Sequence, residues 1–216
     1  MILQMRPEET LQHFSGQPLT RQLLLDLLKA YKRPHDKIAE MVRQQILTPV
    51  KRGLFIPGPA TKVGQPEPFL LANHLYGPSY VSMETALSHW GLIPEKVYEI
   101  ASMTTRRSVE YDTKAGRFTY SHLDLPYYTF GQQQLKLSER QTALVARPEK
   151  ALCDKIIATS GLLFRSGISL RLWLTEDMRM DRDRLRSLRP EMIRSWAKDA
   201  PKQESILLLA KTLEDL

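Results

Sequence analysis

The sequence predicts an α+β protein, in which a small N-terminal unit of helices and one hairpin precedes a mixed α/β domain with an antiparallel sheet and a helical C-terminal tail. Three observations support this prediction. Residues 19–57 change from helical to strand character near residue 47, and residues 97–123 have strand character. Between them, residues 57–68 contain four prolines and two glycines, which marks a linker. We therefore expect domains at residues 1–60 and 61–216.

Residues 19–46 predict two helices joined by a tight turn, and residues 7–14 can supply a helix before them. Apolar residues recur at helical spacing in both helices, as Leu23, Leu24, Leu27 and Leu28 and then as Ile38, Met41, Val42 and Ile46. Pro34 separates them, because the residue before a proline avoids the α conformation. Pro34 itself fits the first turn of the second helix, where its missing N–H costs nothing.

Residues 47–50 and 54–57 predict two very short strands, and Gly53 allows a positive φ in the turn between them. Helix, turn, helix and hairpin in this order are typical of a winged helix-turn-helix that binds DNA. We expect the second helix to read DNA and the hairpin turn to hold phosphate, through Arg33, His35, Lys37, Gln44, Lys51 and Arg52. The alternative is an inert winged-helix scaffold.

The distribution of charge favours a nucleic-acid partner. Residues 1–62 hold ten Lys and Arg against five Asp and Glu, whereas the rest of the chain holds 21 against 19. Most of the net charge of +7 therefore lies in the smaller unit, as expected for a module that binds a polyanion. Asp36 and Glu40 oppose this interpretation, because they lie on the outer side of the predicted recognition helix and repel phosphate.

Residues 69–92 predict two helices around a Gly77-Pro78 turn, with Ser82 as the N-cap of the second helix. Strands are predicted at 97–103, 107–111 and 117–123, with Tyr127, Tyr128 and Phe130 continuing the sheet. A helix is expected from Pro148 to about residue 160, and the chain from residue 170 onward is mostly helical. This tail is rich in arginine, but interleaved Asp and Glu favour a solvated helix face over a second phosphate-binding surface.

Composition indicates an ordinary globular protein, with 42% hydrophobic and 25% charged residues. The first residues lack the apolar run of a signal peptide, and no stretch approaches the length of a membrane span. We therefore expect a cytoplasmic protein without membrane contact. The one cysteine, Cys153, lies in an apolar helical pattern and is expected to be a buried core residue.

No catalytic motif is evident, so we expect no enzyme activity, no metal and no cofactor. The chain has no phosphate-binding or dinucleotide-binding glycine loop, no Gly-x-Ser-x-Gly motif and no histidine pair at the spacing of a zinc helix. Glu149, Lys150 and Asp154 are close in sequence and motivate one alternative, a metal-dependent nuclease. A structural role also accounts for Glu149, because an acidic residue in the first turn of a helix is stabilised by the helix dipole.

Residues 76–123, YGPSYVSMETALSHWGLIPEKVYEIASMTTRRSVEYDTKAGRFTYSHL, resemble the core of the AbiEi-like abortive-infection antitoxins and transcriptional regulators. ARPEKALCD at residues 146–154 and RGLFIPG at residues 52–58 are similar to further motifs of that family, in the same order along the chain. The resemblance extends over about residues 5–160.

This resemblance implies a bacterial type IV toxin–antitoxin system for phage defence. The protein would bind double-stranded DNA at its own promoter as an autorepressor and counteract a nucleotidyltransferase-like toxin, without needing a stable complex with it. Arg106-Arg107 and Tyr127-Tyr128 are candidates for the neutralising surface, although a charged hairpin edge and buried core residues explain them as well. The remaining alternative is a protein-interaction module whose winged helix has lost DNA binding.

Overall fold

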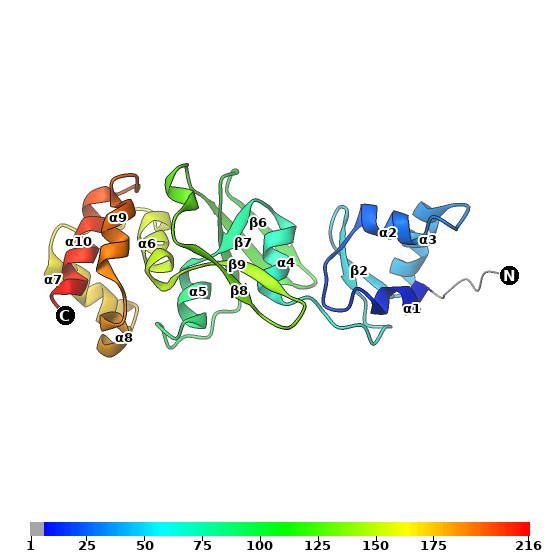
Figure 1. Ribbon diagram of the computed structural model, residues 1–216, viewed down its shortest axis with the longest axis horizontal. Helices are drawn as coiled ribbons and strands as arrows, with labels where there is room; N and C mark the ends of the chain where they lie inside the picture. Colours follow the sequence, from blue (N-terminus) through cyan, green and yellow to red (C-terminus); the bar gives the residue numbers. More distant parts are fainter. Residues whose placement is uncertain (1–6) are drawn as a thin grey trace.

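The computed structural model describes residues 7–216 and shows an elongated molecule. An N-terminal unit of helices and a small sheet lies at one end, a larger sheet lies in the middle, and a group of helices lies at the other end (Figure 1). The N-terminal end of the described chain and the C-terminus are therefore far apart. Within residues 7–216, no helix has both the length and the apolar character needed to cross a bilayer.

The N-terminal unit contains three helices and three strands: α1 (Pro7–Gln12), β1 (Leu19–Thr20), α2 (Arg21–Leu27), α3 (Pro34–Arg43), β2 (Leu47–Lys51) and β3 (Leu54–Pro57). The strands form an antiparallel sheet in the order β1-β3-β2. Buried side chains from the helices and from β1 and β2, among them Leu19, Leu24 and Met41, form its core. The predicted elements of residues 7–57 are all present. Strand β1 was not predicted, because a strand of two residues is too short to show an alternating pattern.

The middle of the molecule is a six-stranded sheet in the order β6-β7-β5-β4-β9-β8. Its strands are β4 (Ser79–Val81), β5 (Ile100–Thr104), β6 (Val109–Thr113), β7 (Gly116–His122), β8 (Gln132–Lys136) and β9 (Thr142–Ala146). Helices α4 (Pro68–Leu75) and α5 (Met83–His89) flank β4 in sequence. The sheet is mixed, because β5 pairs with β7 and β4 with β9 in parallel, and the predicted antiparallel sheet is therefore wrong.

The sequence prediction also lacks three strands of the sheet, β4, β8 and β9. The prediction names a turn at Gly77-Pro78 and an N-cap at Ser82 and no strand between them, because all three residues of β4 are buried and show no alternation of polar and apolar side chains. Tyr127 and Tyr128 were expected to continue the sheet, but they form a short 3-10 helix, η1 (Tyr127–Thr129), with both rings buried. The sheet instead continues in β8, which the glutamines of residues 132–134 concealed.

The C-terminal end is helical, as predicted. It contains α6 (Pro148–Ala158), α7 (Gly167–Leu172), a π-helical turn η2 (Trp173–Asp177), α8 (Arg182–Arg186), α9 (Pro190–Ala197) and α10 (Gln203–Glu214). The longest of these, α10, packs against α9 and α7. Helix α6 connects this end to the sheet through contacts with α5 and β9.

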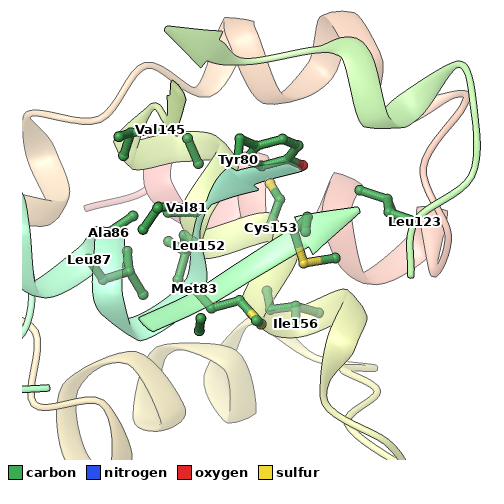
Figure 2. Close-up of a cluster of buried hydrophobic side chains, with 14 of the residues drawn as sticks. Tyr80, Val81, Met83, Ala86, Leu87, Leu123, Val145, Leu152, Cys153 and Ile156 are labelled. Atoms are coloured by element: carbon green, nitrogen blue, oxygen red, sulfur yellow. The ribbon is translucent and has the colours of Figure 1, made fainter. Parts of the chain in front are cut away.

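One large hydrophobic core extends from the sheet into the C-terminal helices. Figure 2 shows side chains of β4, α5 and α6 meeting in it, among them Val81, Leu87 and Leu152. Cys153 is fully buried here, which confirms the sequence expectation, and burial raises the pKa of its thiol to about 12. Val50 and Leu54 of the β2–β3 hairpin belong to the same core, so the hairpin contacts the larger unit.

A second connection joins the two units at the β8–β9 hairpin. The side chain of Gln141 accepts a hydrogen bond of 2.6 Å from the backbone N–H of Glu67 and lies against the backbone of Gly16. The amide of Gln17 donates to the carbonyl oxygen of Arg140 at 2.6 Å. Residues 57–68 are therefore held by polar contacts to both units, through Glu67 to Gln141 and through the N–H of Gly64, which donates to the hydroxyl of Ser15 at 3.0 Å. The predicted domain boundary near residue 60 stays a prediction.

Candidate nucleic-acid interface

Helix α3 has one face in the core and one face in solvent. Pro34 occupies its first turn, as the sequence predicted, and Ile38 and Met41 are buried against the N-terminal core. Arg33, His35 and Gln44 are exposed at the two ends of the helix, while Lys37 is partly buried. Four of the six predicted DNA-binding residues therefore lie on or beside one accessible helix.

Acidic side chains occupy the same surface. Glu40 accepts hydrogen bonds from Lys37 and from Gln44, each at 3.0 Å, and the bond from Lys37 holds the pKa of the Glu40 carboxyl below its usual value. The guanidinium of Arg33 lies 3.8 Å from the carboxylate of Asp36, with both side chains well exposed. The charged groups of α3 are thus paired with each other, the Arg33–Asp36 pair in solvent and the Lys37–Glu40 pair partly buried. Ion pairs at the surface are weak enough to open for another partner.

Helix α2 contributes a cation that sequence analysis missed. The guanidinium of Arg21 lies 3.3 Å from Nδ1 of His35, and the backbone N–H of Arg21 donates to the carbonyl oxygen of Gly53 at 2.8 Å. Arg21 therefore connects the start of α3 with the hairpin turn. Its place directly after the N-cap Thr20 is visible in the sequence, but its proximity to residue 53 depends on the pairing of β1 with β3.

The hairpin turn presents its two basic residues differently. Gly53 has a φ of +84°, as the turn requires, and Arg52 is exposed. The ammonium of Lys51 instead points to the larger unit, where it donates to the carbonyl oxygen of Leu75 at 2.5 Å. It also lies 5.7 Å from the centre of the Tyr76 ring and 5.5 Å from that of Tyr111. The side chain of Lys51 therefore points away from the residues of α3 with which it is predicted to bind DNA.

The three residues behind the nuclease alternative are buried in α6. Lys150 and Asp154 are fully buried, and the ammonium lies 3.0 Å from Oδ1 of the carboxylate. Glu149 turns to another element, where its carboxylate accepts a hydrogen bond of 3.1 Å from the backbone N–H of Arg189. Protein groups therefore occupy all three, and among residues 7–216 no three His, Cys, Asp or Glu side chains are gathered as metal ligands.

Asp154 is the centre of a buried polar network. Its Oδ2 accepts hydrogen bonds from the hydroxyls of Ser82, at 2.7 Å, and Tyr80, at 2.9 Å. Ser82 occupies the N-cap position of α5, as predicted. Its hydroxyl, however, donates its hydrogen bond to Asp154 and makes no capping bond to the helix. Burial lowers the pKa of Lys150 and raises that of Asp154, while the attraction between the two groups opposes both shifts. We interpret this network as a means of joining α6 to β4.

Four of the seven arginines between residues 171 and 194 form ion pairs with acids. Arg194 forms an ion pair with Glu214, Arg186 with Asp183, and Arg179 with Glu95. Arg186–Asp183 is a pair within one helix, of the kind that the interleaved charges predict, whereas the Arg194 and Arg179 pairs join separate elements. The exposed cations of the N-terminal unit are therefore the better candidates for contact with an anionic ligand.

No protein-family model matches the chain, and no curated protein matches it in sequence. Among solved structures, the chain is similar to the one described as the crystal structure of RV2827C protein from Mycobacterium tuberculosis. The similarity covers 97% of this chain and 78% of that chain, with a TM-score of 0.63 and 15% sequence identity. At this identity the likeness concerns the fold alone, and it supports the α+β architecture.

Proposed function

We propose that this protein is a DNA-binding autorepressor and antitoxin of an abortive-infection type toxin–antitoxin system, and that residues 7–57 form its winged helix. The single observation that carries the DNA-binding part is the placement of α3. This helix has one buried and one open face, and the β2–β3 hairpin with its basic turn follows it, paired with β1 in a three-stranded antiparallel sheet. Winged helices that read the major groove use the same order of elements.

The antitoxin part rests on sequence resemblance. Residues 76–123 and 146–154, which are similar to the AbiEi-like family, form β4 to β7 and the start of α6. A toxin partner of the nucleotidyltransferase class follows from that resemblance alone. Coexpression tests it directly: the full-length protein is expected to restore growth of cells that express the neighbouring toxin gene, and failure to do so contradicts the antitoxin assignment.

DNA binding is tested by titrating the full-length protein against its own upstream DNA at two salt concentrations, with scrambled DNA as competitor. We expect specific retention that weakens as salt increases, because released counterions drive phosphate binding. Equal retention of scrambled DNA would leave only non-specific binding and contradict the autorepressor assignment.

The pairing around Glu40 favours a second candidate, a protein-interaction module with a degenerate winged helix. A matched pair of variants separates the two. Glu40→Gln removes the negative charge that Lys37 pairs with, whereas Glu204→Gln makes the same change of charge on α10, which lies at the far end of the molecule (Figure 1). If α3 reads DNA, Glu40→Gln is expected to tighten binding about two- to fivefold, the range of one exposed ion pair, and Glu204→Gln to leave it unchanged. Equal effects of both variants would favour the second candidate.

A further inference from the structure

The turn of the β2–β3 hairpin and the loop between β5 and β6 bring two cations onto one aromatic ring. The ammonium of Lys51 lies 5.7 Å from the centre of the Tyr76 ring, and the guanidinium carbon of Arg106 lies 5.5 Å from the same centre. Lys51 belongs to the N-terminal unit and Arg106 to the larger one. The two units therefore share a cationic surface that neither has alone.

Within residues 7–216, no carboxylate forms an ion pair with a cation of this surface. Lys51, Arg52, Arg106 and Arg107 take part in none of the ion pairs formed among residues 7–216. Burial, followed by repulsion from Arg106, lowers the pKa of Lys51. Like charges held close together without a counterion are unfavourable, and a bound anion removes that cost. In contrast, Arg179, Arg186, Arg189 and Arg194 of the C-terminal tail have acidic partners.

Three hydrogen bonds hold the backbone of the loop that carries Arg106 and Arg107, and a fourth holds the side chain of Ser108 beside them. The N–H of Arg106 donates to the hydroxyl of Thr104 at 3.2 Å, and Nδ1 of His122 lies 2.9 Å from the carbonyl oxygen of Arg106. The hydroxyl of Tyr76 donates to the carbonyl oxygen of Arg107 at 3.3 Å, and the N–H of His122 donates to the hydroxyl of Ser108 at 2.9 Å. The carbonyl groups are thus used within the protein, while both arginines are exposed. A loop ordered in this way loses little entropy when its arginines bind a ligand.

The cationic surface continues to the start of α3. Arg21 contacts both the hairpin turn, through Gly53, and His35 at the beginning of the helix. A line of contacts therefore runs from His35 through Arg21 and the hairpin turn to Arg106. Figure 1 shows the same neighbourhood, with the N-terminal unit beside the part of the sheet that holds α4 and β6.

We propose that Arg106 and Arg107, with Lys51 and Arg52 beside them, bind the sugar-phosphate backbone of double-stranded DNA next to the site that α3 reads. This inference rests on the proposed DNA-binding function and adds a contact made by the larger unit. Arginine suits this role because its planar guanidinium donates to two phosphate oxygens at once, and such contacts position a protein on DNA without reading sequence.

A pair of double variants of the full-length protein tests the proposal. Arg106→Gln with Arg107→Gln removes two charges from the loop, and Arg182→Gln with Arg184→Gln removes two exposed arginines from α8 at the far end of the molecule. The loop variant is expected to weaken binding to specific and scrambled DNA alike. Its salt slope is expected to fall by about two units, or one per lost phosphate contact, while the α8 variant retains the wild-type slope. Arg106→Lys with Arg107→Lys is expected to restore most of the slope.

The outcomes separate the inference from the function on which it rests. If wild-type protein binds its promoter and the loop variant binds with the same affinity and slope, the loop contact is overturned and the proposed function stands. If the wild-type protein binds no duplex DNA, both fail. A loop variant that loses affinity only for RNA would overturn the assignment to DNA. Melting temperatures of both double variants equal to that of the wild type show that neither result comes from unfolding.

Discussion

The ammonium of Lys150 lies 3.0 Å from the carboxylate of Asp154, one turn further along α6, and both side chains are completely buried. The carbonyl oxygen of Tyr127 accepts a further hydrogen bond from Lys150 at 3.1 Å, and the ammonium lies 3.4 Å from the centre of the Tyr127 ring. Helix α6, β4 and η1 therefore meet at one buried ion pair.

Removing one partner of this pair is expected to destabilise the protein strongly. Lys150→Met leaves the Asp154 carboxylate buried without its cation, and Asp154→Leu leaves the ammonium without its anion, at a cost of about 3–5 kcal/mol each. The double variant is expected to be more stable than either single variant, because it buries no uncompensated charge. Urea denaturation of the three variants measures these free energies of unfolding. Additive losses in the double variant would contradict the coupling.

Gly131 is expected to tolerate no side chain. It has a φ of +63°, and a Cβ there would lie 2.7 Å from Cβ of Lys150, which the ion pair holds in place. Gly161 is a matched control, since its φ is +71° and a Cβ there would meet nothing within 4 Å. Gly131→Ala is expected to cost about 1–3 kcal/mol more than Gly161→Ala, because both pay for the left-handed backbone but only one is overpacked. Equal losses in thermal unfolding would show that residue 131 can shift away from Lys150.

His122 is expected to titrate above 6.5, its ordinary pKa, because it is bonded to the carbonyl of Arg106 and to the carboxylate of Asp124, each at 2.9 Å. Only the protonated ring donates to both at once. Since the pKa of His122 is higher in the folded state, its protonation stabilises the folded protein. This stabilisation is complete below the pKa of the unfolded state and is lost as pH rises through the pKa of the folded state. An NMR titration of the ring protons measures the value, which Asp124→Asn is expected to lower. A wild-type value at or below 6.5 would contradict these two hydrogen bonds.

Gln141 is expected to hold the N-terminal unit against the larger one. Gln141→Ala removes the acceptor for the N–H of Glu67, at a cost of about 0.5–1.5 kcal/mol, and loosens residues 58–66. Limited proteolysis is expected to cleave this stretch faster in the variant than in the wild type. Gln134→Ala changes an exposed glutamine on the same hairpin and serves as the control. Equal cleavage rates in both variants would show that other contacts hold the units together.

The comparison of residues 19–57 with residues 79–146 shows what local pattern can predict. Pro34, Gly53 and the apolar stripe of α3 act through nearest neighbours, so the helices and the hairpin of the N-terminal unit were found from the sequence. Strand β4 has three residues buried on both faces and no periodicity, and its partners β5 and β9 come from distant parts of the chain. Residues 79–81 therefore form a strand because they pair with β5 and β9, and no local pattern in their sequence indicates it.

The candidate site divides in the same way. The residues of α3 and the exposed Arg52 were predictable, because they lie beside an amphipathic stripe and a glycine turn. The contact of Lys51 with Leu75, and the approach of Arg106 to Tyr76, were not predictable from spacing.

The sequence by itself determined the helices, the wing-like hairpin, the concentration of positive charge in residues 1–62 and the burial of Cys153, because each depends on neighbouring side chains or on composition. Only the tertiary structure decided the mixed order of the sheet, the partner that Ser82 serves and the joining of two cationic loops around Tyr76. These features come from contacts between distant parts of the chain, which the packing of a shared core selects and no local pattern encodes.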